Sequence, residues 1–307
     1  MTKKYQEVPS NFSSFESYMI YKKEEVVDAF TNAHQYFFYD TCSILHHSNS
    51  AKRQSIINYL RSKADIIIVT RTVLMELTAN SFELHPVQIQ YFSELYNSGL
   101  KIILFDEELI YDCLKEALSI STDDANKLLG YAIKEVSIYK TKTREVIENM
   151  DKSILNKLIG ANPGNRELFS TFCQYARSLK SEGDSLAEEL ILICIIVLTR
   201  IPAGRYFLIS DDTRIMSQVI SVNKYILRYH GRKEPYQLTT ASLIQKMYKD
   251  HEIVERDDML EILQAAFNGN VHVFYVGEYD IQLMDQTFKC EDLIDRMINE
   301  RDFIVIY

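Results

Sequence analysis

Short apolar runs alternate with helical segments along much of the chain, and this alternation constrains the fold more than any other feature. The runs cover residues 36–40, 64–70, 101–105 and 205–210. Short buried runs separated by helical segments are typical of βα units in a parallel sheet. The low content of 9 Gly and 5 Pro disfavours the many tight turns of an all-β sandwich. We therefore predict an α/β protein built on a parallel sheet flanked by helices.

Three regions lie outside these runs. Between the third and fourth runs, roughly a hundred residues show helical periodicity, so we predict a helical insertion at about residues 107–183. Residues 10–33 indicate a leading helix. The tail has strand-like segments at 271–276 and 303–307 around a helix at 291–299. The expected organisation is an N-terminal helical segment, a core and a small αβ C-terminal appendage, with bounds 1–35, 36–249 and 250–307.

The net charge and the cysteine content exclude some classes of function for this chain. The net charge of −9 argues against a protein that coats DNA regardless of sequence. It does not exclude an enzyme that acts on nucleic acid, because local basic patches can steer a substrate. The five cysteines are scattered without a CxxC pair. This pattern indicates neither a disulfide framework nor a zinc site, but reduced thiols in the cytoplasm.

No targeting or membrane segment is expected. The first residues lack the apolar stretch of a signal peptide. The longest apolar run, residues 190–198, falls short of the ~20 residues that a bilayer requires, and acidic and basic residues flank it. We predict a buried helix there, no membrane partner and a cytoplasmic location.

Acidic residues follow the ends of the predicted strands. Asp40 ends the first run, and Asp211 and Asp212 follow the fourth. Glu76 lies in the helical segment after the second run, and Asp184 opens the helix that leads to the fourth. Ligands of an open parallel sheet bind beyond the carboxyl ends of its strands. These side chains could therefore meet at one edge of the sheet.

Such a cluster suits a divalent cation. Two carboxylates about 5 Å apart repel by roughly 3 kcal/mol at an effective dielectric constant of about 20, and a bound cation offsets that repulsion. An oxygen-only ligand set without clustered Cys or His favours Mg²⁺ or Mn²⁺ over zinc. A metal-bound water can attack a phosphodiester. The predicted metal ligands are Asp40, Glu76, Asp184, Asp211 and Asp212, with Glu188 as an accessory ligand one helical turn after Asp184.

Four segments resemble the acidic motifs of PIN-domain ribonucleases in order and in strand context: YFFYDTCSIL, IIIVTRTVLMELT, EGDSLAEELILI and YFLISDDTRIM. The resemblance covers roughly residues 36–247. It implies a Rossmann-like parallel sheet and a metal-dependent endoribonuclease. Asp40, Glu76 and Asp184 would be the first three catalytic ligands. In the fourth motif Ser210 would stand for the family's Thr and Asp212 for its Asp.

The chain differs from the family in three respects. The second and third motifs are much further apart than in small toxin-type members, Cys42 replaces a short polar residue, and residues after 250 lie outside the resemblance. The resemblance implies an RNA substrate. It also allows an inhibitory or regulatory protein partner, as in toxin–antitoxin pairs, a role in defence or RNA processing, and a homodimer.

Two basic stretches could contact RNA phosphates, YKTKTR at 139–144 and RYHGRK at 228–233. Both also suit a solvated helix face. The second follows the fourth motif, so the predicted RNA-binding residues are Arg228, Arg232 and Lys233.

Three other interpretations stay open. Asp40, Asp184 and Asp211 each precede a helix, where Asp is a common N-cap, although Glu76 cannot be one. The fold could also be a catalytically silent scaffold or an RNA-binding module. A phosphatase of the haloacid-dehalogenase type would need a second Asp two residues after Asp40, where Cys42 stands.

Overall fold

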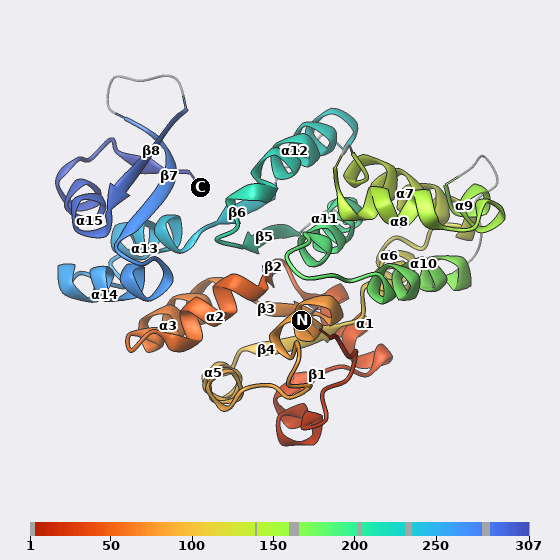
Figure 1. The fold of residues 1–307 in the computed structure, drawn as a ribbon, viewed down its shortest axis with the longest axis horizontal. Coiled ribbons are helices and arrows are strands. Elements are labelled where there is room, and N and C mark those ends of the chain that lie inside the picture. Colours follow the sequence, from red (N-terminus) through yellow and green to blue (C-terminus); the bar gives the residue numbers. More distant parts are fainter. Residues whose placement is uncertain are drawn as a thin grey trace.

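The chain adopts an α/β fold with a six-stranded parallel sheet flanked by helices, as the computed structural model shows (Figure 1). The structure describes residues 4–138, 140–159, 166–201, 204–230, 235–277 and 283–306. This confirms the predicted α/β class, and the arrangement is consistent with a Rossmann-like fold.

The sheet has the order β1-β4-β3-β2-β5-β6. From β2 the chain adds β3 and β4 on one side, then returns to add β5 and β6 on the other. The strand order therefore reverses between β2 and β5, and ligands bind at such switch points in open parallel sheets. The strands are β1 (Met19–Ile20), β2 (Gln35–Tyr39), β3 (Ile66–Thr70), β4 (Lys101–Phe105), β5 (Arg205–Ile209) and β6 (Tyr236–Leu238).

The central strands are buried, which explains their apolar sequence. Every residue of β3 is buried, and Phe37 of β2 stacks on Phe207 of β5 with ring centroids 4.3 Å apart. The helices of this part are α1 (Lys23–Asn32), α2 (Thr41–Asn49), α3 (Arg53–Lys63), α4 (Arg71–Leu77), α5 (Pro86–Asn97), α11 (Leu186–Leu198), α12 (Met216–His230) and α13 (Thr240–Lys249).

Helix α11 is the predicted buried helix. Every one of its residues is buried, because it packs between α4 and three helices of the preceding stretch, α6 (Ile110–Leu118), α7 (Thr122–Val136) and α8 (Lys142–Asn149). None of the helices in the described part of the chain is both long and apolar enough to cross a membrane.

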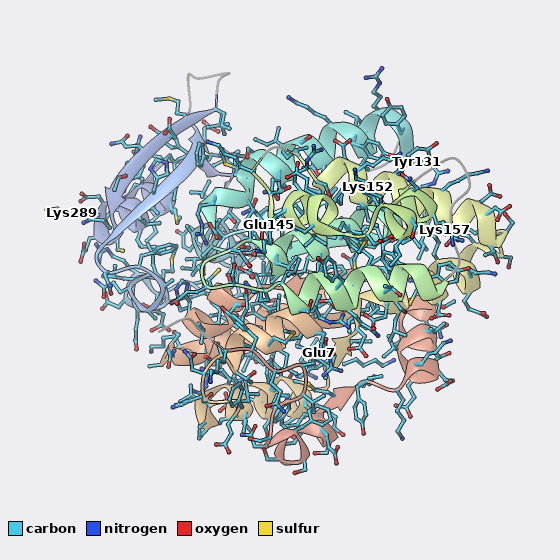
Figure 2. The ribbon with its side chains drawn as sticks, turned by 45° about the vertical axis from the view of Figure 1, so that its right-hand side comes forward. Glu7, Tyr131, Glu145, Lys152, Lys157 and Lys289 are labelled. Carbon is cyan, nitrogen blue, oxygen red and sulfur yellow. The ribbon has the colours of Figure 1, made fainter. Side chains whose placement is uncertain are left out.

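The stretch between β4 and α11 is helical, as predicted, and lies to the right in Figure 1. Arg177 connects the last helix of this stretch to the turn after β4 and to the N-terminal segment. Its Nη1 donates to Glu107 Oε2 at 2.8 Å, and its Nε donates to Glu7 Oε1 at 3.0 Å. Glu7 is labelled in Figure 2. The helices are α6 (Ile110–Leu118), α7 (Thr122–Val136), α8 (Lys142–Asn149), α9 (Lys152–Ile159) and α10 (Arg166–Ser178).

Both ends of the chain contain elements that the sequence did not predict. Residues 10–33 form two 3-10 turns, the edge strand β1 and the short helix α1 in place of one helix. The tail adds α14 and β8 to the predicted elements and forms a separate antiparallel sheet of order β8-β7-β9. The tail elements are α14 (Arg256–Ala266), β7 (Asn270–Val276), β8 (Met284–Lys289), α15 (Cys290–Asn299) and β9 (Ile304–Val305).

Candidate active site

Five predicted ligands line one pocket of about 240 Å³. They come from the exit of β2, from α4, from the loop before α11 and its first turn, and from the exit of β5. The pocket therefore lies at the switch point of the sheet. These five residues are Asp40, Glu76, Asp184, Glu188 and Asp212.

Asp40 is 1% exposed and receives hydrogen bonds on one oxygen only. Ser210 Oγ and Cys42 Sγ donate to its Oδ2 at 3.0 and 2.8 Å. Its Oδ1 has no partner among the described residues. Although Asp40 precedes α2, its side chain does not cap that helix. Burial and the neighbouring Glu76 raise the pKa of Asp40 to about 6.

Glu188 has a similar environment in the first turn of α11. It is 5% exposed, and its Oε2 is a second buried oxygen that no described residue contacts through a hydrogen bond. Burial, with smaller effects of Asp40 and Glu76, raises the pKa of Glu188 to about 10. When no metal ion is bound, this raised pKa favours the protonated form of Glu188 at neutral pH.

Glu76 and Asp184 share an ammonium group. Lys180 Nζ lies 2.6 Å from Glu76 Oε1 and also pairs with Asp184 Oδ1. Burial alone would lower the pKa of Lys180, but the two carboxylates raise it above its ordinary value. Thr41 Oγ1 donates to the other oxygen of Glu76, and the Ser181 amide donates to Asp184 Oδ2 at 2.6 Å.

Asp212 lies at the mouth of the pocket with a cation of its own. Arg214 Nε donates to both carboxylate oxygens of Asp212 at 2.9 Å. The Arg214 side chain is 67% exposed, so it is free to reach toward a ligand. Asp212 is held in place by its own amide, which donates to Ser210 Oγ at 3.2 Å.

Asp211, the sixth predicted ligand, does not line this pocket. Its Oδ1 accepts from the Thr240 amide at 2.6 Å, and its Oδ2 accepts from Thr240 Oγ1 at 2.7 Å and contacts His46 Nδ1 at 2.8 Å. Burial raises the pKa of Asp211, but the hydrogen bonds of His46 and Thr240 outweigh it and hold the pKa below its usual range. Asp211 therefore joins α2 to the start of α13.

As the side chains stand, no group of three or more His, Cys, Asp and Glu in the described ranges could hold a metal ion. Lys180 and Arg214 form ion pairs with three of the carboxylates. The donor set itself suits a hard cation, since it offers carboxylate oxygens. The unpartnered oxygens of Asp40 and Glu188 are the two places where such an ion would find an unused ligand.

The predicted RNA-binding residues lie away from the pocket or outside the described residues. Arg228 is exposed in the last turn of α12, with its guanidinium 5.2 Å from the ring centroid of Tyr229. It follows the start of α12 by 12 residues, or about 18 Å of helix. Arg232 and Lys233 lie outside the described residues.

The other basic stretch adjoins the pocket. Lys140 and Lys142 line a cavity of about 520 Å³ that shares Asp184 and Arg214 with the acidic pocket. Lys140 and Arg144 also line the next cavity, of about 710 Å³. The cavities therefore favour this stretch over Arg228 as the path of a polyanion from the carboxylates.

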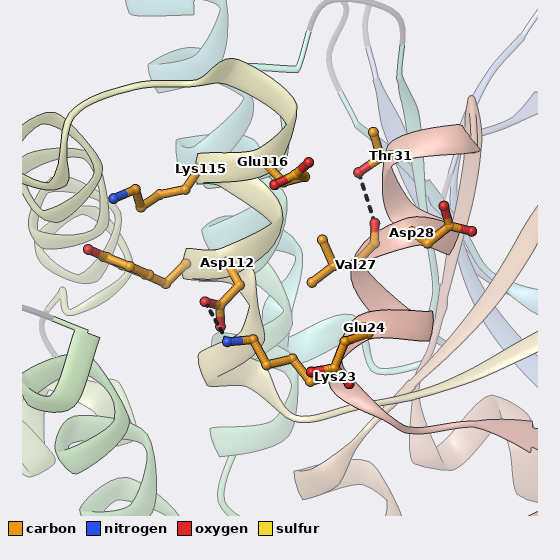
Figure 3. Close-up of a pocket in the computed structure, with 9 residues that line it drawn as sticks. Lys23, Glu24, Val27, Asp28, Thr31, Asp112, Lys115 and Glu116 are labelled. Atoms are coloured by element: carbon orange, nitrogen blue, oxygen red, sulfur yellow. Dashed lines mark hydrogen bonds and ion pairs between the residues drawn. The ribbon is translucent and has the colours of Figure 1, made fainter.

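A larger groove of about 560 Å³ separates α1 from α6 (Figure 3). It carries charges of both signs, and Lys23 Nζ pairs with Asp112 Oδ1 at 3.1 Å. None of the unpartnered buried side-chain atoms in the described part of the chain lines it. Among the described residues, the groove thus lacks the unpartnered buried carboxylate oxygens of the acidic pocket.

Sequence reasoning missed three residues of the pocket: Tyr5, Lys180 and Arg214. Lys180 precedes Asp184 by four residues, and Arg214 follows Asp212 by two. This proximity was a signal that the carboxylates have cationic partners. No protein-family model matches the chain, and no solved structure matches it.

Proposed function

We propose that the chain is a metal-dependent nuclease with a PIN-like core that hydrolyses RNA phosphodiester bonds. The supporting observation is the pocket at the switch point, which five carboxylate side chains line and where two of them keep buried oxygens without a partner in the described ranges. Burying charged oxygens without partners is costly unless a cation compensates them. A pocket of this kind is therefore expected to serve binding rather than stability.

Asp40 and Glu188 would hold Mg²⁺ or Mn²⁺, with Glu76, Asp184 and Asp212 beside them. A bound ion would supply a Lewis acid and lower the pKa of a coordinated water. Ser210 keeps Asp40 in position through its hydrogen bond, and Thr41 does the same for Glu76. Arg214 at the mouth can pair with a phosphate through its planar guanidinium.

The choice of RNA, an inhibitory or regulatory protein partner and a homodimer are supported by the resemblance to PIN-domain ribonucleases. A second candidate function is a catalytically silent RNA-binding platform. The ion pairs of Lys180 and Arg214 favour it, because they neutralise carboxylates without any metal.

The deciding experiment is cleavage of a panel of RNAs and DNAs in Mn²⁺ and in chelator. We expect RNA cleavage by the wild type only with the metal, and a loss of at least about 100-fold in Asp40→Asn, since metal ligands contribute several kcal/mol to catalysis. Glu116→Gln is the matched control, because Glu116 is an exposed carboxylate of the α1–α6 groove (Figure 3). RNA binding without cleavage, in Mn²⁺ as well as in chelator, would support the platform instead.

A further inference from the structure

Four of the five pocket carboxylates fall into two pairs according to their hydrogen-bond partners, and the fifth, Asp212, pairs with Arg214. Asp40 and Glu188 each keep a buried oxygen that no described donor reaches. Glu76 and Asp184 have donors on both oxygens: Lys180 on one, and Thr41 or Ser181 on the other. Among the described residues of the pocket, only the first pair keeps a buried carboxylate oxygen that accepts no hydrogen bond.

Lys180 is part of the buried structure of the pocket. Its side chain is 2% exposed, and the ammonium lies 5.5 Å from the ring centroid of Tyr5. It also contacts the carbonyl oxygens of Ser181 and Asp184 at 3.3 and 3.4 Å. An ammonium taken out of water needs such partners, so moving it away from Glu76 and Asp184 would leave a buried charge unpaired.

We propose that Lys180 is a permanent cation of the pocket, standing between Glu76 and Asp184 where a second divalent ion would otherwise bind. The pocket then takes one divalent ion, at Asp40 and Glu188. Lys180 acts as a positioning residue, because it fixes two carboxylates and sets the number of metal ions. This inference rests on the metal site of the proposed function.

The test counts Mn²⁺ ions by equilibrium dialysis and calorimetry, with no nucleic acid present. We expect one ion per wild-type chain and one in Lys180→Arg, which keeps the charge. Lys180→Met should bind a second ion, because Glu76 and Asp184 lose their cation. Lys127→Met removes an exposed lysine of α7 and should behave as the wild type. Two ions in the wild type, or one ion in Lys180→Met with unchanged affinity, would overturn the inference.

A second measurement needs no variant that must fold. Amine acetylation of the wild type, followed by mass spectrometry, reports the accessibility of Lys180. We expect Lys180 to react at least tenfold more slowly than Lys127 in chelator and to stay equally protected in saturating Mn²⁺. Fast reaction of Lys180 only in Mn²⁺ would show that the ion displaces it, which contradicts a permanent cation. Failure of the wild type to bind Mn²⁺ at all would instead overturn the proposed function itself.

Discussion

Asp211 and Asp212 are neighbours in sequence with opposite environments. Asp212 lines the pocket, whereas Asp211 accepts hydrogen bonds that join α2 to α13. We predict that Asp211→Asn lowers the free energy of unfolding by about 2–4 kcal/mol, because an amide cannot replace an acceptor-only carboxylate. Asp212→Asn should leave stability within about 1 kcal/mol and abolish cleavage. Urea denaturation measures the stability of both variants, and an RNA cleavage assay measures their activity. The reverse pattern would mean that Asp211, and not Asp212, is the acidic ligand of the fourth motif.

Glu188 makes stability depend on pH in an unusual direction. Its pKa is raised to about 10 from an ordinary 4.5, so the folded protein binds more protons than the unfolded chain between these values. The associated stability is complete below about pH 4.5 and is lost as pH rises toward 10. In chelator, the wild type should lose up to about 1.4 kcal/mol per pH unit more than Glu188→Gln between pH 6 and 9.

Urea melts of both proteins across this range test the sign. Equal slopes in chelator would mean that Glu188 ionises normally. Mn²⁺ should reduce the difference in pH dependence between the wild type and Glu188→Gln, because a bound cation favours the charged carboxylate of Glu188.

At the scale of elements, the basic segment before and within α8 is expected to bind the substrate if the chain acts on RNA. Lys140 and Arg144 line cavities that continue from the acidic pocket, whereas Arg228 lies at the far end of α12. Replacing both Lys140 and Arg144 by Ala should make the slope of log K for RNA binding against log salt concentration shallower by about 1.4. Each contact with a phosphate of a single strand contributes about 0.7 to this slope. Arg228→Ala is the comparison, and a larger effect there would restore the second basic stretch as the binding site.

The sequence predicted those strands and helices that a pattern of neighbouring residues is enough to indicate. The runs that became β2, β3, β4 and β5 are apolar because both faces of a central parallel strand are buried. By contrast, β1 has two residues, and β8 is exposed at all but one position, so neither carries an apolar pattern. The pocket carboxylates could be predicted because most of them lie just after a predicted strand or at the start of a predicted helix. Lys180 was missed because it lies in the loop between α10 and α11, whose position beside β2 and α4 no local pattern indicates.

At the scale of the whole molecule, α13 connects the two sheets. Gln245 donates to the Phe303 carbonyl at 2.8 Å and accepts from the Val305 amide at 2.9 Å, while it packs in the buried face of α13. We predict that Gln245→Met lowers the free energy of unfolding by about 2–4 kcal/mol, because two buried backbone groups lose their partners. Gln264→Met, on the exposed face of α14, is the control. Hydrogen exchange should show the loss first in β9, and identical denaturation midpoints would contradict this link.

The ribosome makes the carboxylate residues of the pocket at widely different times. Asp212 follows Asp40 by 172 residues, the difference of their positions, and β5 is inserted beside β2 only after the helices between them. At about 5–20 residues per second, a ribosome needs roughly 10–30 s to make that stretch. A nascent chain that carries Asp40 and Glu76 thus has no complete pocket until Asp212 has been made. For an enzyme that cuts RNA, the order of the strands would delay activity during the synthesis of residues 40–212.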